Sequence, residues 1–158
     1  MAEFINEISG VLIPVTGGNV LLPNAAIAEL VGYTPPGSMA CDEPWVEGCI
    51  QWRGWQVPLF SFARMAQLAD EERQATARIA VLKALNGSTN MSFLAMVTQG
   101  FPQLVSVSKQ NLNVVPGAEM TPGVAYQIEI DGQTGYIPDL AHVEKTLSRC
   151  LAEARKSA

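Results

Sequence analysis

Closely spaced turn signals are the feature of this sequence that most constrains its fold. Short apolar runs alternate with glycine, proline and asparagine along most of the chain. The dipeptides Gly17-Gly18, Asn86-Gly87 and Asp131-Gly132 are strong hairpin signals, because their residues adopt positive φ at little cost. Arg53-Gly54 separates two further strand-like runs. This pattern predicts antiparallel strands joined by tight turns, in an all-β sandwich or barrel.

The hairpin signals divide the expected strands into pairs. The predicted ranges are 10–15 and 19–22, 46–52 and 55–60, 79–85 and 92–97, 125–130 and 133–137, and two shorter strands at 104–107 and 112–115. No internal repeat or low-complexity linker interrupts this series, so we expect one domain over residues 1–158.

Helical signals are few. Asn24 is expected to cap a short helix that ends at Leu30, and Ser61 to start another over 62–68, followed by a solvated loop at 70–73. The clearest helix follows Asp139, a good N-cap. Its apolar residues recur at helical spacing at Leu140, Val143, Leu147, Leu151 and Ala154. We expect this stripe to dock on the β-structure.

Composition and charge exclude several kinds of partner. Hydrophobic residues make up 48% of the chain and charged residues only 16%, below the roughly 25% of an average soluble domain, which predicts a partly apolar surface. A formal net charge of −5 argues against nucleic acid and anionic lipid. The long uncharged stretches 8–28 and 84–108 are interrupted by turn residues, so neither is expected to insert into a membrane.

The sequence offers little for catalysis or metal binding. Cys41, Cys49 and Cys150 are odd in number and widely spaced, which predicts neither a disulfide framework nor a zinc site and suits a reducing cytoplasm. Cys49 is interpreted as a small buried hydrophobic residue. The single histidine, His142, is expected on the solvated face of the last helix. Nucleotide-binding and serine-hydrolase motifs are absent, so we expect no enzymatic activity, metal or cofactor.

The segment 44–60 has an unusual combination of residues. Gly48 stands near the start of a strand, Arg53-Gly54 forms a turn between Trp52 and Trp55, and Pro58 lies within the next strand, where it favours an edge or bulge. Taken alone, the segment is explained by hairpin architecture, with a tryptophan in the core and Arg53 in solvent.

In its wider context this segment resembles the CheW-like domain family, the adaptors of bacterial chemosensory arrays. The resemblance rests on the glutamate-bearing segment 27–30, the hairpin 44–54 and the strand at 56–62, with Glu29 and Arg53 separated by 24 residues. It extends over a core of about residues 7–151, so 1–158 is expected to be a single CheW-like domain.

Several positions depart from the family pattern. Ser61 stands where aspartate is usual, 98–100 replace a Val-Asp-Gly segment, and the usual leucine-aspartate ending before the last helix is missing. The chain is therefore more similar to auxiliary CheW-like proteins of the pathways that govern type IV pili and twitching.

The resemblance implies both a fold and a function. The implied fold is two small SH3-like five-stranded barrels that share a core, with short helices and a C-terminal helix. The implied function is that of a cytoplasmic, non-enzymatic adaptor, without a cofactor, between the cytoplasmic tip of a chemoreceptor and the regulatory domain of a histidine kinase. Other CheW-like proteins are further candidate partners.

The resemblance also implies which residues bind the partner. Glu29 and Arg53 form a charge pair beside the receptor groove, and Gly48 lets a partner backbone approach, so Gly48→Asp or Arg53→Ala is expected to weaken recruitment and leave a folded monomer. The complete set of implied partner-binding residues is Glu29, Arg53, Gly48, Gly54, Ile27, Val105 and Phe101, of which the last three are candidate apolar lining.

Two other functions remain open at this stage. One is a β-barrel enzyme or ligand-binding protein with a pocket between the barrels, which would recruit Cys49, Arg53 or His142. The other is an attenuator that competes with the main adaptor for the same groove.

Overall fold

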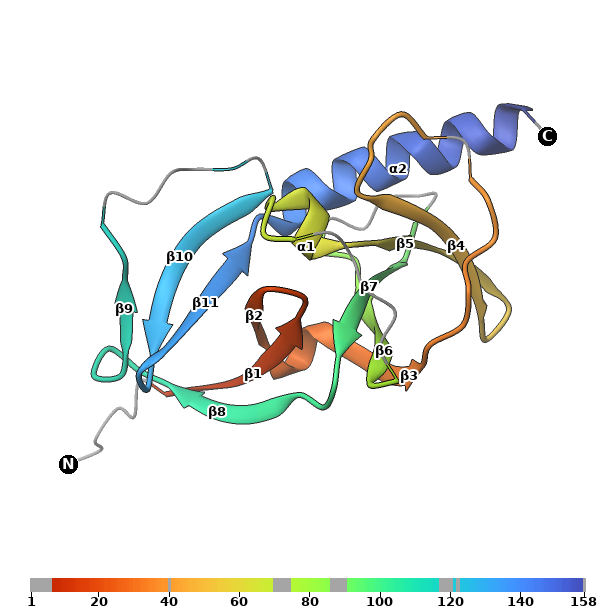
Figure 1. Ribbon diagram of the computed structural model, residues 1–158. Coiled ribbons are helices and arrows are strands. Elements are labelled where there is room, and N and C mark those ends of the chain that lie inside the picture. Colours follow the sequence, from red (N-terminus) through yellow and green to blue (C-terminus); the bar gives the residue numbers. More distant parts are fainter. Residues whose placement is uncertain are drawn as a thin grey trace.

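Two β-sheets and a long C-terminal helix make up the structure (Figure 1). It is a computed structural model that describes residues 7–39, 41–69, 75–85, 91–116, 121 and 123–157, with side chains to residue 154. The expected all-β class with a C-terminal helix is confirmed. The predicted turn at Asn86-Gly87 and the predicted loop at 70–73 lie outside the described residues.

The first sheet has six strands in the order β8-β1-β2-β11-β10-β9. Its strands are β1 (Ile8–Val15), β2 (Gly18–Pro23), β8 (Gln103–Val107), β9 (Leu112–Val114), β10 (Val124–Ile130) and β11 (Gln133–Pro138). All its neighbouring strands are antiparallel except β2 and β11, which meet in parallel at Val20 and Tyr136. The sheet thus unites the two ends of the chain, and it has one strand more than the five expected.

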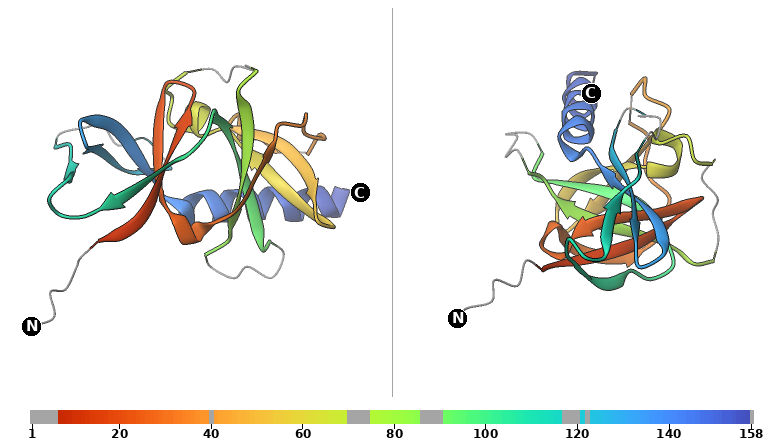
Figure 2. Two further views of the ribbon diagram at one scale, coloured as in Figure 1. Left: turned by 90° about the horizontal axis from the view of Figure 1, so that it is seen from below. Right: turned by 90° about the vertical axis from the view of Figure 1, so that its left-hand side faces the viewer.

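The second sheet has the expected five strands, in the order β3-β6-β7-β5-β4. They are β3 (Ile27–Gly32), β4 (Val46–Trp52), β5 (Trp55–Phe60), β6 (Ala77–Lys83) and β7 (Phe93–Gln99). The predicted hairpin 46–60 is confirmed in both of its strands. Each sheet curls into a barrel-like unit, and Figure 2 shows the two units side by side.

One apolar cluster connects the two sheets. It contains Val11 and Ile13 of β1 together with Phe60 and Leu82 of the second sheet, all at most 3% exposed. Helix α2 (Leu140–Ser157) adds four residues of its predicted stripe to the same cluster, namely Leu140, Val143, Leu147 and Leu151. Each sheet also has a smaller apolar cluster of its own, but this largest cluster draws on both sheets and the helix, so the two units share a core, as expected.

The helix predicted over 24–30 is wrong. Only Asn24–Ala26 form a short 3-10 helix, η1, and Asn24 is its first residue rather than its N-cap. The chain then continues as β3, whose Leu30 pairs with Ala80 of β6. Pairing with a neighbouring strand outweighed the helical preference of this alanine-rich, leucine-containing segment.

The other two helices start where predicted. The Ser61 hydroxyl accepts a hydrogen bond from the Arg64 amide (3.2 Å) at the start of α1 (Phe62–Met65), which ends before Leu68 because Gln67 adopts a left-handed conformation with φ 58°. Asp139 caps α2 by accepting from the His142 amide (3.2 Å). No helix in the described part of the chain is both long and apolar enough to cross a membrane.

Two side-chain predictions need correction. His142 is half-buried, with its ring centroid 6.4 Å from that of Trp45, rather than on a solvated face. Cys41 and Cys150 form a disulfide, although the sequence predicts none. They are separated by 109 residues and become neighbours, with Cα atoms 5.2 Å apart, only because α2 packs against the connection between β3 and β4. Cys49 is buried, as predicted.

The shared core predicts that shortening a buried side chain of α2 destabilises the protein. Leu147→Ala should lower the free energy of unfolding by about 2–5 kcal/mol, because it removes a fully buried side chain from the cluster that both sheets use. Lys145→Ala, at an exposed position on the same helix, should change it by about 0.5 kcal/mol or less. Urea unfolding of both variants tests this, and equal losses would contradict the role of α2 in the core.

Candidate functional site

The hairpin of β4 and β5 ends in a tight two-residue turn. Trp52 pairs with Trp55, and the two residues between them have positive φ, 48° at Arg53 and 81° at Gly54. Positive φ at both central residues defines a type I′ turn, whose twist matches that of the flanking strands. The turn presents the Arg53 side chain at the hairpin tip, where it is 69% exposed.

The carboxylate of Glu29 joins this tip to another strand. Arg53 Nη2 lies 2.5 Å from Glu29 Oε1, and the indole Nε1 of Trp52 donates to Glu29 Oε2 (3.3 Å). The Arg53 guanidinium also lies over the Trp52 ring, with Cζ 5.1 Å from the ring centroid. The two residues that the family resemblance singles out as a charge pair are therefore in direct contact.

This contact closes the second sheet into a barrel. Glu29 lies on β3, at one edge of the strand order, whereas Arg53 follows β4, at the opposite edge. The two edges can meet only because the sheet curls. The ion pair itself is exposed and should contribute only about 0–1 kcal/mol to stability. Its main effect is to hold a cation, an anion and an indole in one fixed arrangement at the surface.

An aromatic group lies beside the ion pair. The Phe93 ring, at the start of β7, packs edge to face on Trp52 at 4.8 Å and on Trp55 at 5.4 Å between centroids. Trp55 is 48% exposed. Sequence reasoning missed Phe93, because no local pattern places residue 93 beside residues 52 and 55. The pairing of β7 with β5 brings it there.

Gly48 contacts the chain itself rather than open space. A Cβ at this position would lie 2.1 Å from the carbonyl oxygen of Gly37, and Gly48 has φ +137°, a conformation that other residues rarely adopt. Gly37 is fixed there by two hydrogen bonds with Cys49, of 2.8 and 2.9 Å. This geometry favours a role of Gly48 within the chain rather than in making room for a partner backbone, and it predicts that Gly48→Asp disturbs the fold.

The three residues expected to line an apolar groove occupy different places. Ile27 is half-buried and packs against the shared core, two residues before Glu29 on the same strand. Val105 is half-buried on β8, in the other sheet. Phe101 is 71% exposed, and Arg78 of β6 stacks on its ring with Cζ 5.2 Å from the centroid. Leu104, which sequence reasoning did not select, is equally exposed at 73%.

Two hollows lie away from this hairpin. One, of about 240 Å³, is apolar and belongs to the first sheet, with Ile8, Gly10, Leu21, Leu22, Pro23, Val107, Leu112 and Ile137 as its lining. The other, of about 500 Å³, is lined by Pro44, Arg64, Gln67, Leu68 and Ala69. Neither hollow is lined by Cys49, Arg53 or His142, the residues that a ligand-binding or enzymatic function was expected to recruit.

Fold and surface together define a class of protein. Two curled β-sheets share a core beneath a C-terminal helix, and the charged and aromatic groups brought together at a hairpin tip lie at the surface. This is the architecture of a two-barrel β-domain that presents a fixed pattern of side chains at its surface.

Comparison with known families shows to which family this domain belongs. The model of the CheW-like domain matches residues 9–146, which is most of the chain. The chain therefore belongs to the CheW-like domain family, a family of non-enzymatic scaffold proteins of chemotaxis signalling. The resemblance noted in the sequence is thereby confirmed at the level of the family.

A solved structure confirms the fold. The crystal structure of the scaffolding protein TtCheW from Thermoanaerobacter tengcongensis aligns with a TM-score of 0.70, over 89% of this chain and 90% of that chain, at 12% sequence identity. A comparison with curated proteins gave no match.

The geometry at Gly48 makes a second prediction. Gly48→Ala should destabilise the protein by at least about 1–3 kcal/mol, because the new Cβ meets the Gly37 carbonyl and the backbone has positive φ. Gly32→Ala is the matched control on an exposed strand position, where an added Cβ has no neighbour within 4 Å. Thermal or urea unfolding measures both, and a Gly48→Ala variant as stable as Gly32→Ala would show that this close contact is not formed.

Proposed function

We propose that the protein is a cytoplasmic adaptor that couples the cytoplasmic tip of a chemoreceptor to the regulatory domain of a histidine kinase. Membership of a family of chemotaxis scaffold proteins supports this proposal. The single observation that carries it is the Glu29–Arg53 ion pair, which stands at the surface with its geometry fixed by Trp52. A protein partner can recognise such an arrangement by binding alone, without any chemical reaction.

The ion pair acts in this proposal through specificity. In water it contributes little to stability, but a partner that covers it removes solvent, and a fixed pair of charges then sets the orientation and register of the complex. Arg53 and Glu29 are 69% and 34% exposed, so both are accessible to a partner. Trp55, half exposed beside them, adds the type of aromatic anchor that dominates many interfaces.

The other proposed partner-binding residues have different roles in the proposed site. Gly54 permits the turn that presents Arg53, and Gly48 shapes the base of the same hairpin through its contact with Gly37. Phe101, together with Leu104, offers exposed apolar surface. Ile27 is half-buried against the shared core and Val105 is half-buried in the first sheet, so each offers a partner only the exposed part of its side chain.

We also propose that the protein is an accessory member of a chemosensory system for type IV pili and twitching, in which other CheW-like proteins are additional partners. This assignment is based on the departures from the family pattern at 98–100 and before α2. Serine at position 61 neither supports nor opposes this assignment, because it caps α1 as an aspartate would.

Recruitment of variants tests the adaptor function. Arg53→Ala and Glu29→Ala should each weaken co-sedimentation with receptor-containing membranes and kinase by about tenfold, because each removes half of the recognised pair. Lys145→Ala is the control, since residue 145 is exposed on α2 away from the hairpin. Thermal unfolding verifies that the variants fold.

A charge-swapped double variant separates a partner contact from a purely internal role. Glu29→Arg combined with Arg53→Glu can restore the ion pair within the chain but reverses what a partner meets. The proposal expects recruitment to stay lost. Recovery of recruitment would mean that the pair only closes the barrel, and normal recruitment by Arg53→Ala would contradict the proposed site.

A further inference from the structure

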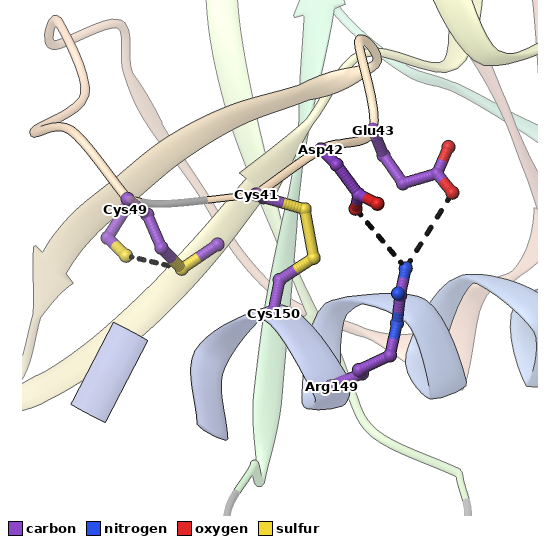
Figure 3. The surroundings of a disulfide bond; sticks show 7 residues. Cys41, Asp42, Glu43, Cys49, Arg149 and Cys150 are labelled. Carbon is purple, nitrogen blue, oxygen red and sulfur yellow. Dashed lines mark hydrogen bonds and ion pairs between the residues drawn. A yellow bond between two sulfur atoms is a disulfide. The ribbon is translucent and has the colours of Figure 1, made fainter. Parts of the chain in front are cut away.

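The disulfide connects the C-terminal helix to the long connection between β3 and β4. Figure 3 shows Cys41 in this connection and Cys150 on α2, with Asp42, Glu43 and Arg149 beside them. Cys150 is fully buried, whereas Cys41 is half-buried and is therefore the more exposed residue of the pair. The Cα atoms are 5.2 Å apart, within the range that a disulfide requires without movement of the backbone.

The same connection is attached to the edge of the second sheet. Gly37 exchanges two backbone hydrogen bonds with Cys49 on β4, and Met39 Sδ accepts a hydrogen bond from the Cys49 thiol at 3.1 Å between sulfur atoms. β4 is the last strand of its sheet, so Gly37 covers part of an edge that would otherwise be open. Cys41 follows Gly37 by four residues, and both attachments therefore act on one short segment.

The ion pairs between the connection and α2 are weak. Arg149 lies 3.6 Å from Asp42 and 3.7 Å from Glu43, and all three side chains are at least 36% exposed. Exposed pairs at such distances contribute little, because water and salt screen them. The disulfide is thus the strong link between this part of the connection and α2.

We propose that Cys41 and Cys150 form a reversible thiol–disulfide site that reacts with low-molecular-weight thiols and disulfides and controls the attachment of Gly37 and Met39 to the β4 edge. The inference draws on the proposed cytoplasmic location for one point only. Disulfides in that compartment are usually transient or redox-sensing rather than structural.

Oxidation proceeds by two exchange steps. The Cys41 thiolate attacks a low-molecular-weight disulfide, forms a mixed disulfide and releases one thiol. The Cys150 thiolate then attacks the Cys41 sulfur, which forms the protein disulfide and releases the second thiol. Two protein thiols become one disulfide, one small disulfide becomes two thiols, and the two protein protons end on the released thiols. Reduction is the reverse reaction, and we expect it to start at the sulfur of Cys41, the less buried residue of the pair.

Reduction should loosen the connection where it meets β4. Without the covalent link, the segment is held by the Gly37–Cys49 hydrogen bonds, by the packing of Met39 against the shared core and by the exposed ion pairs of Arg149. Local opening should then be more frequent, and it exposes the amide of Cys49. This position adjoins Gly48, at the base of the hairpin that carries Arg53. The redox state is thereby transmitted to the edge of the sheet that bears the candidate site.

A redox titration of the isolated protein tests the reversible site. Incubation with glutathione and glutathione disulfide at varied ratios, followed by alkylation and mass measurement, should show the Cys41–Cys150 pair passing from dithiol to disulfide as the share of glutathione disulfide rises. Cys41→Ser is the control and should form no intramolecular disulfide. A pair that stays fully oxidised or fully reduced at every ratio would overturn the proposal.

Amide hydrogen exchange tests the effect on the loop. In the reduced protein, exchange at Gly37 and Cys49 should accelerate about tenfold or more relative to the oxidised protein, while amides in the β6–β7 pairing stay unchanged. Cys41→Ser should match the reduced protein under both conditions. Equal exchange in the two redox states would overturn the control of the β4 edge.

Metal binding is the competing explanation for two cysteines beside an acid. Ligand atoms of Cys41, Asp42 and Cys150 lie within 4.8 Å of one another. The reduced protein should therefore also be titrated with Zn²⁺, and tight stoichiometric binding that blocks oxidation would overturn the redox proposal. None of these measurements uses a receptor or kinase, so their outcome is independent of whether the adaptor function holds.

Discussion

The shared apolar core is the constraint on which the rest of the structure depends. Each curled sheet has a small apolar cluster of its own, but the largest cluster is shared, because β1, β5, β6 and the stripe of α2 meet in it. Burial of this surface is the dominant favourable term in folding, and it fixes the position of α2 against the connection between β3 and β4. The disulfide, the edge contact at Gly37 and the hairpin base all follow from that packing.

The ion pair at the hairpin tip links barrel closure to recognition. Glu29 and Arg53 come from opposite edges of one sheet, so their contact joins the two edges. The same contact presents a cation, a carboxylate and an indole at the surface. A scaffold protein needs a surface that keeps its shape without a partner, because preorganisation lowers the cost of binding. The type I′ turn and the contact between Trp52 and Phe93 provide that rigidity.

Gly48 illustrates how a structural and a functional role can be confused at a motif position. Its backbone conformation and the adjacent Gly37 carbonyl require glycine for reasons internal to the chain. An effect of substitution at Gly48 on binding is therefore transmitted through the connection from β3 to β4. That same connection carries Cys41, so one segment contacts the hairpin base at Gly48 and is linked through the disulfide to α2.

The sequence by itself determined the features that depend on local chemistry. Turn dipeptides located both strands of the 46–60 hairpin, Ser61 and Asp139 located helix starts, and the apolar stripe located the docking face of α2. The family motif also selected Glu29 and Arg53. Only the tertiary structure decided that 27–32 is a strand, that Cys41 meets Cys150, that Phe93 joins the tryptophans and that Gly37 fills the space beside Gly48. The physical reason is separation along the chain. These contacts join residues that are distant in sequence, and their energies come from neighbours that no local sequence pattern specifies.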